Sequence, residues 1–291
     1  MKSGPAKAGV PVTVTSGSTA AAMVVAQAFT KQPPRLGLGA PLTLRGGEPD
    51  ALRRLTLELG LGWQPQLRSM VDQAVVQVRD ERSPWFKLPP LLLTGEAGIG
   101  RTHAARRIAY AAGVPHAYLD FRDPAGIDQL RPRACGPDLV LPALPVLAMA
   151  IGGCANPIIS VVGAECLDRA SLHDFAALID PATAGKFVDH ATGCMVDLRQ
   201  ISWLVQCSDP REISSALSGL FVPVEMRWPG NDSLPLHVAE VLAEAAIDAE
   251  VIDQLGHPVA DALTHLCRMG RRRSTAEIYN AARLWLGTHC Q

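Results

Sequence analysis

Apolar residues fall into short runs separated by segments with helical spacing along most of the chain. Five apolar runs predict buried strands, at residues 91–93, 116–121, 157–162, 201–207 and 221–226. The intervening segments place apolar residues three and four positions apart and predict helices at 103–112, 139–151, 168–179 and 211–220. Strands that alternate with helices favour right-handed crossovers and an α/β fold with a parallel sheet.

The two ends of the chain have a different character. Residues 1–45 are low in charge, rich in Gly, Pro, Ser and Thr and without a sustained period, so we expect a low-complexity tail that is disordered or extended. Residues 46–230 hold the predicted strands, preceded by an amphipathic helix around 67–78. Residues 231–291 contain four helical patterns and no strand pattern, which predicts a small all-helical domain. These patterns lie at 236–245, 249–255, 259–269 and 275–286, and Ser274 with Glu277 has the form of a capping box before the last of them.

Composition excludes several classes of protein. The chain has 291 residues, of which 48% are hydrophobic, and a net charge of −1, so no basic surface for nucleic acid is expected. No apolar run is long enough to cross a membrane. The seven cysteines form no CxxC pair, which favours a reducing compartment. The N-terminal stretch is too rich in Ser, Thr and Pro for an export signal, so we expect a cytoplasmic protein.

A glycine-rich segment follows the first predicted strand and opens a predicted helix. The spacing of Gly95, Gly100, Arg101 and Thr102 fits the phosphate-binding loop G-x-x-x-x-G-K-[ST] except at the lysine position, where Arg101 stands. Backbone N–H groups at the start of a helix bind anions. The candidate nucleotide-binding residues are therefore Gly95, Glu96, Ala97, Gly98, Ile99, Gly100, Arg101, Thr102 and His103. The alternative is an ordinary glycine-rich turn between a strand and a helix.

Three blocks of sequence resemble AAA+ ATPases, and among these the ATPase module of Lon-type proteins and bacterial Lon-like AAA ATPases. The blocks are residues 88–103, 156–159, and 179–189 with 196–203. The resemblance covers about residues 50–287 and implies a P-loop parallel sheet with helices on both faces, followed by a helical lid. It also implies ATP as the ligand, with Mg²⁺ on the Thr102 hydroxyl.

The same resemblance shows where catalytic groups are missing. Arg101 stands at the position of the family's lysine, and Val162 and Gly163 stand at the positions of its two Walker B acids. Sensor 1 falls on Ser208 and sensor 2 on Ala276. The arginine finger falls on residues 219–221, which contain no arginine. Arginine keeps the charge of lysine but not its compact shape. Glu165 is the single, weak catalytic candidate, and the alternative for it is a solvated helix start. Arg271–Arg273 is a charge run just before the last helix.

These positions lead to a functional expectation with two alternatives. We expect an ATP-binding AAA+ protein with impaired or absent hydrolysis that acts as a regulatory or structural subunit, because phosphoryl transfer depends on charge stabilisation. The alternatives are an active ATPase that remodels protein partners and a nucleotide-free interaction scaffold. The expected partners are other proteins or AAA+ subunits in a ring, with neither nucleic acid nor membrane. Nothing resembles the Lon protease domain, so proteolysis is not expected.

Overall fold

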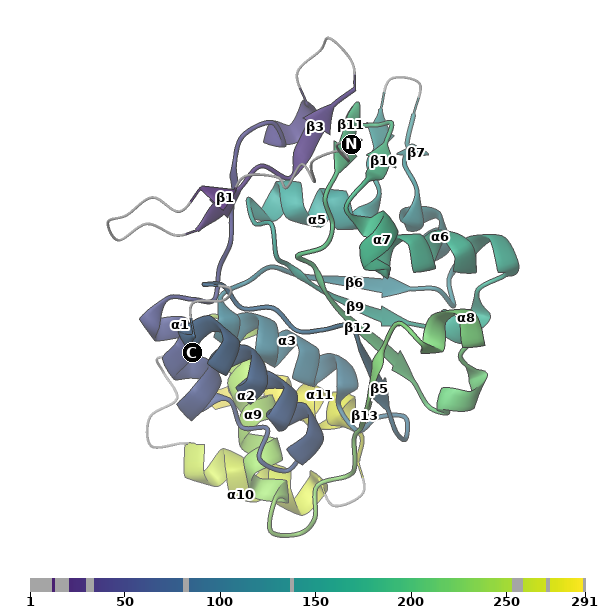
Figure 1. The fold of residues 1–291 in the computed structure, drawn as a ribbon. Coiled ribbons are helices and arrows are strands. Elements are labelled where there is room, and N and C mark those ends of the chain that lie inside the picture. Colours follow the sequence, from purple (N-terminus) through teal and green to yellow (C-terminus); the bar gives the residue numbers. More distant parts are fainter. Residues whose placement is uncertain are drawn as a thin grey trace.

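The computed structural model describes residues 12–13, 21–29, 34–80, 84–136, 139–252, 259–270 and 273–289. Its centre is a parallel five-stranded sheet with the order β13-β5-β12-β9-β6 (Figure 1). The strands are β5 (Leu91–Thr94), β6 (His116–Asp120), β9 (Ile158–Val162), β12 (Ser202–Cys207) and β13 (Val222–Glu225). All five agree with the predicted apolar runs, which confirms the α/β fold with a parallel sheet.

Helices cover both faces of this sheet (Figure 1). One face carries α2 (Pro65–Arg79) and α3 (Arg101–Ala112). The other carries α5 (Leu144–Gly152), α6 (Arg169–Ile179) and the short α7 (Pro181–Ala184). Successive strand residues point to opposite faces. The structure therefore has the predicted three layers.

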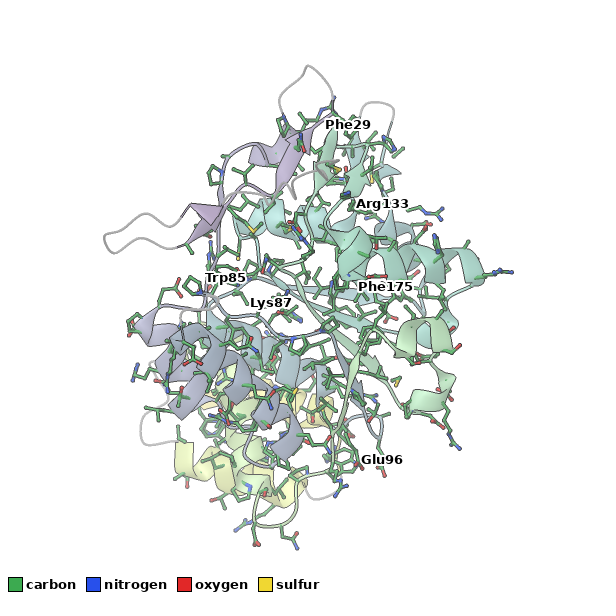
Figure 2. All side chains as sticks on the ribbon, viewed as in Figure 1. Phe29, Trp85, Lys87, Glu96, Arg133 and Phe175 are labelled. Carbon is green, nitrogen blue, oxygen red and sulfur yellow. The ribbon has the colours of Figure 1, made fainter. Side chains whose placement is uncertain are left out.

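Each face of the sheet has its own apolar core. Leu91 and Leu93 belong to the core beneath α3, whereas Leu92, between them, belongs to the opposite core. Phe175 of α6 lies in that second core, 5.7 Å from the ring of Trp203 on β12 (Figure 2). Alternate burial on both faces explains why these strands read as continuous apolar runs.

Two predicted helices differ in part from the structure, because prolines and extended residues interrupt both segments. Residues 139–151 were expected to be a buried helix, broken or entered at Pro142 and Pro145. Val140–Leu141 instead forms a strand, β8, and α5 begins at Leu144, between these two prolines. Pro145 lies in the first turn of α5, where its missing N–H is harmless. Residues 211–220 were expected to form one helix. The structure has two short helical segments there, the 3₁₀ turn Pro210–Glu212 and α8 (Ser215–Ser218), separated by the extended residue Ile213.

The N-terminal region is more ordered than the sequence predicts. Residues 21–29 and 34–45 contain β2 (Ala22–Met23), β3 (Ala26–Ala28) and β4 (Leu42–Thr43). A two-residue strand, β1 (Val12–Thr13), pairs with β2, and β2 pairs with β4. The strands of these segments are extended, which is one of the two states expected for them, while residues 1–11, 14–20 and 30–33 lie outside the described residues. The strands are too short for their alternation to be recognised in the sequence.

Pairing with a distant hairpin holds this region in place. β3 pairs with β11 (Cys194–Val196), which also pairs with β10 (Phe187–Asp189). Met23 and Val25 are 4% and 3% exposed and belong to the same core as Phe175. The N-terminal segment is thus part of the α/β body.

The C-terminal region is helical throughout most of its described part. It comprises α9 (Leu234–Asp248), α10 (Val259–Gly270) and α11 (Thr275–His289), which share a separate apolar core. A helix was also expected at 249–255; residues 249–251 are not helical, and 253–258 lie outside the described residues. No helix in the described ranges is long and apolar enough to cross a membrane. The residue boundaries between domains remain predictions.

The predicted capping box is present at the start of α11. The backbone N–H of Glu277 donates to the Ser274 hydroxyl at 3.3 Å, and the Ser274 N–H donates to the Glu277 carboxylate at 2.7 Å. The reciprocal bonds satisfy donors that a helix start leaves free. They fix the entry into α11, which matters because this end of the helix lies at the glycine loop.

Asn156 ties the N-terminal segment to the start of β9. Its side chain accepts from the Arg45 N–H at 2.9 Å and donates to the carbonyls of Arg45 and Phe86 at 2.9 and 2.8 Å. The residue is 1% exposed. Removing it leaves buried backbone groups without partners, each worth about 1–3 kcal/mol.

We therefore expect Asn156→Leu to lower the free energy of unfolding by about 2–5 kcal/mol, measured by urea denaturation. Gln73→Leu, on the exposed side of α2, is the control and should change it by less than about 1 kcal/mol. Equal effects of the two substitutions would contradict the account.

Candidate functional site

The glycine loop between β5 and α3 has a backbone that favours glycine. The φ angles of Gly95, Gly98 and Gly100 are +136°, +86° and +93°, in the region that residues with a side chain rarely adopt. Gly100 is the N-cap of α3 and provides no side-chain cap. The first N–H groups of α3 are consequently available to an anion, which is how phosphate loops act.

A cavity of about 380 Å³ opens beside this loop. It lies among the loop, α3, the carboxyl ends of β9 and β12, and helices α9 and α11 of the C-terminal region. Ligands of open α/β sheets bind outside the carboxyl ends of the strands, where this cavity lies. Its volume is within the range of small-molecule sites.

The structure brings most of the predicted loop residues to the cavity. The predicted residues that line it are Ala97, Gly98, Gly100, Arg101, Thr102 and His103. Gly95, Glu96 and Ile99 are not among them. Ile99 is 1% exposed inside the core, and Glu96 accepts a hydrogen bond from the Trp228 indole at 2.6 Å. Figure 2 places Glu96 at the loop end of the sheet, opposite Trp85 and Lys87, which precede β5.

Arg101 braces the loop from within. Its Nη1 donates to the carbonyl of Gly95 at 2.6 Å and to the carbonyl of Cys207, the last residue of β12. Burial lowers the pKa of Arg101 and raises the pKa of the Cys207 thiol to about 11. The guanidinium therefore joins two strand ends and supplies positive charge to the cavity wall.

Gln206 is a site residue that the sequence reasoning missed. It lies on β12 and is 4% exposed, and its Oε1 accepts from the Thr102 hydroxyl at 3.0 Å. Its Nε2 has no hydrogen-bond partner among the described residues. Gln206 and Ser202 are the two polar residues in the run 201–207, and this polarity was the available signal.

The positions expected for catalytic acids offer no carboxylate to the cavity. Val162, the last residue of β9, lines it. Gly163 follows with φ +75°, and a Cβ there would meet the backbone nitrogen of Arg122 at 2.8 Å. Glu165 is exposed and does not line the cavity, although its charge offsets part of the lowering of the Arg101 pKa that burial causes. Glu165 therefore lacks the placement of a catalytic group in this arrangement.

The remaining predicted positions divide between the cavity and the surface. Ala276 of α11 lines the cavity, whereas Ser208 is exposed beyond the end of β12. Arg273 forms an ion pair with Glu277 at 3.6 Å. Arg271 and Arg272 lie outside the described residues.

The expected Mg²⁺ finds few ligands here. Within the described ranges, no group of three or more His, Cys, Asp or Glu residues is placed to hold a metal ion. Glu244 is the single carboxylate that lines the described cavity, and it already pairs with His103 and Arg106. The Thr102 hydroxyl alone does not fit the oxygen-rich coordination that Mg²⁺ requires.

The first residues of α11 rest directly on the glycine loop. The Thr275 N–H donates to the carbonyl of Gly98 at 2.8 Å. A Cβ on Gly98 would meet the Ser274 Cβ at 2.8 Å, and one on Gly100 would meet the Thr275 hydroxyl at 2.8 Å. Glycine is therefore required at both positions by the close approach of α11 as well as by φ.

Ion pairs hold α9 against α3 beside the same loop. Arg106 pairs with Glu244 at 2.8 Å and with Asp248 at 2.6 Å. Arg107 pairs with Glu240 at 2.8 Å. The helical region is thus attached to the α/β region along α3.

His237 of α9 completes the contact between the two regions. Its Nε2 lies 3.1 Å from the Thr275 hydroxyl, and its ring is 4.6 Å from Trp63 and 5.9 Å from His103. Burial, helped by the nearby His103, lowers the pKa of His237 to about 4. This histidine is therefore neutral at physiological pH.

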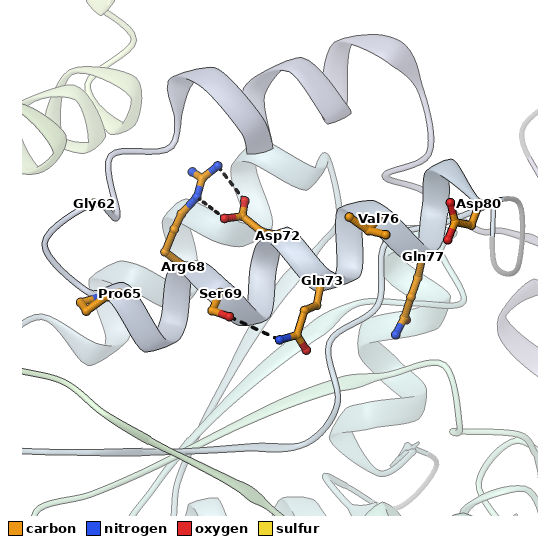
Figure 3. Close-up of a pocket in the computed structure, with 9 residues that line it drawn as sticks. All are labelled: Gly62, Pro65, Arg68, Ser69, Asp72, Gln73, Val76, Gln77 and Asp80. Carbon is orange, nitrogen blue, oxygen red and sulfur yellow. Dashed lines mark hydrogen bonds and ion pairs between the residues drawn. The ribbon is translucent and has the colours of Figure 1, made fainter.

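A larger hollow of about 600 Å³ lies on the outer side of α2 (Figure 3). Its polar side chains pair with one another along the helix, Arg68 with Asp72 and Ser69 with Gln73. None of the unpartnered buried polar atoms found in the described residues lies in it. The cavity beside the glycine loop is the better candidate site.

The chain is similar to a known sequence and resembles a solved structure more distantly. No protein-family model matches the chain. Lon protease 2 of Thermus thermophilus is 27% identical over 167 residues, which is 52% of this chain and 20% of that protein. The chain thus matches about a fifth of the length of that relative. A mutant RuvB of Thermotoga maritima matches over 77% of this chain and 70% of its own at 15% identity, but the TM-score of 0.41 is too low to support a conclusion.

The similarity to Lon protease 2 agrees with the layout of the fold. A parallel sheet with a glycine loop after β5, followed by a helical region, is what the resemblance to AAA+ proteins implies. Together these observations support an AAA+ P-loop ATPase-like fold.

We expect Gly100→Ala to lower the free energy of unfolding by about 1–3 kcal/mol, because the new methyl group strains a positive φ and meets Thr275. Thermal and urea unfolding measure the change. Gly230→Ala is the matched control, since nothing lies within 4 Å of its Cβ position. A Gly100→Ala protein as stable as wild type would contradict the close docking of α11.

The depressed pKa of His237 gives a dependence of stability on pH. Between pH 6.5 and 4 the unfolded histidine binds a proton while the folded one does not, so stability falls as the pH falls. The loss is on the order of 3 kcal/mol. We expect His237→Gln to flatten this slope in urea titrations at several pH values, and the exposed His265→Gln to leave it as in wild type. An unchanged slope in His237→Gln would contradict the burial of a neutral His237.

Proposed function

We propose that this protein binds ATP at the glycine loop, hydrolyses it slowly or not at all, and acts as a regulatory or structural subunit among AAA+ proteins. The single observation that carries the proposal is the combination found around one cavity. A glycine loop with positive φ at Gly95, Gly98 and Gly100 lies next to the end of β9, where Val162 carries no acid.

The binding half of the proposal rests on the loop. Its glycines, the open start of α3 and the charge of Arg101 are suited to an anion of two or more phosphates. The adjoining volume of about 380 Å³ leaves room for the phosphates and part of a nucleoside.

The hydrolysis half rests on missing charge. An ATPase stabilises the transition state with a metal, a compact lysine, a polarising acid and an arginine, and one in-trans arginine alone is worth about 10³–10⁵ in rate. Here Arg101 is bound to two carbonyls, and Val162 replaces an acid. These losses act in one direction even though they do not add.

A second function, the nucleotide-free scaffold, is favoured by the docking of α11. The Thr275 N–H donates a hydrogen bond to the Gly98 carbonyl, and Ser274 packs against Gly98 on that side of the loop. In this alternative the loop serves to hold the helical region in place.

A thermal-shift measurement with ATP distinguishes the two functions. We expect millimolar ATP to raise Tm by several degrees, because a ligand at 100 times its Kd stabilises the native state by about 2.7 kcal/mol. Thr102→Val should reduce the shift, and Ser69→Ala on α2 should leave it intact. The absence of any shift with ATP or ADP would favour the scaffold.

A steady-state assay of phosphate release tests turnover. We expect a rate at the background of the assay, equal in wild type and Thr102→Val. Release at the rate of an ordinary AAA+ ATPase, abolished by Thr102→Val, would instead establish the active ATPase that remodels partners.

A further inference from the structure

The buried amide of Gln206 is an unexplained feature of the cavity. Of the three buried side-chain atoms without a hydrogen-bond partner in the described residues, Nε2 of Gln206 is the one whose residue lines it. An N–H group buried without an acceptor costs about 1–3 kcal/mol. The native protein tolerates this cost where a ligand supplies the acceptor.

The polarity of that amide decides which ligand atom it meets. Gln206 Oε1 already accepts from the Thr102 hydroxyl, so the atom of this lining residue that is left without a partner is a donor. An N–H donor attracts an anionic oxygen and cannot coordinate a cation. The Thr102 hydroxyl donates its proton to Gln206 and keeps only its oxygen lone pairs for a ligand.

The surrounding charges point the same way. Arg101 is anchored to the carbonyl of Cys207, the residue after Gln206, and brings a permanent positive charge to this strand end. Val162 pairs with Gln206 in the β12–β9 register and is apolar. The one carboxylate of the described lining, Glu244, is engaged by His103 and Arg106. The wall therefore offers donors and a cation where a metal site needs oxygens.

We propose that Gln206, together with Arg101, takes the place of a divalent cation, so that the site binds a nucleoside polyphosphate through a terminal phosphate oxygen without metal. The proposal rests on the proposed ATP binding and specifies its chemistry. Gln206 acts here as a specificity-determining residue, because a hydrogen bond to a charged oxygen rewards a ligand that presents one at this point.

Calorimetric titration of the full chain with ATP, once in excess EDTA and once in MgCl₂, tests the proposal. We expect wild type to bind ATP at least as tightly in EDTA as in Mg²⁺. Gln206→Met keeps the shape and removes the donor, and it should raise Kd about 10- to 100-fold in both buffers.

Gln206→Glu should reverse the effect of Mg²⁺ on ATP affinity, which a purely structural role of Gln206 would not do. Its carboxylate should repel ATP in EDTA, and Mg²⁺ should restore part of the affinity because the carboxylate and the Thr102 hydroxyl then offer two oxygens to the ion. Gln73→Met and Gln73→Glu, the same changes on exposed α2, should leave Kd unchanged in both buffers. Melting of each variant without ligand checks folding, and if Gln206→Met does not fold, Gln206→Glu carries the test.

The outcomes separate this proposal from the one on which it rests. Wild-type binding that requires Mg²⁺, or binding by Gln206→Met as tight as wild type, would overturn the metal-free site and leave ATP binding intact. Binding of ATP in neither buffer would overturn both.

Discussion

The close contact between α11 and the glycine loop is the constraint on which the site depends. Thr275 donates to the Gly98 carbonyl, and the loop has no room for side chains at Gly98 and Gly100. Arg101 holds the same loop from the sheet side through the carbonyls of Gly95 and Cys207. The loop is therefore fixed from two directions, and its accessible side faces the cavity at the ends of β12 and β9.

Under the proposed function, this arrangement binds phosphate without transferring it. The N–H groups at the start of α3 can bind an anion if the backbone of the loop keeps its conformation, and three glycines with positive φ maintain that conformation. Transfer needs acids and a metal at defined points, and the strand end at Val162 supplies neither. Gln206 adds an unpartnered N–H donor, its Nε2, to the residues that line the cavity. In the proposed regulatory role, a ligand bound at the loop would contact the same segment that holds the start of α11.

The sequence predicted the fold best where one physical signal dominated. All five strands of the central sheet were apolar runs, and the strand–loop–helix context located the glycine loop. The N-terminal strands were missed because two or three residues, as in Ala26–Ala28, cannot show a period. Gln206 and the ion pair of Arg107 with Glu240 were missed because their partners lie more than 100 positions away in the chain. Such contacts exist only after the fold has formed.

One measurement addresses binding and turnover together. Phosphorus-31 spectra of ATP, recorded over hours with a stoichiometric amount of the protein, report the environment of each phosphate and the appearance of inorganic phosphate in the same sample. The account predicts shifted or broadened ATP resonances that persist, with no inorganic phosphate beyond a protein-free control. Unperturbed ATP resonances would contradict binding at the glycine loop, and steady growth of inorganic phosphate would contradict the loss of hydrolysis.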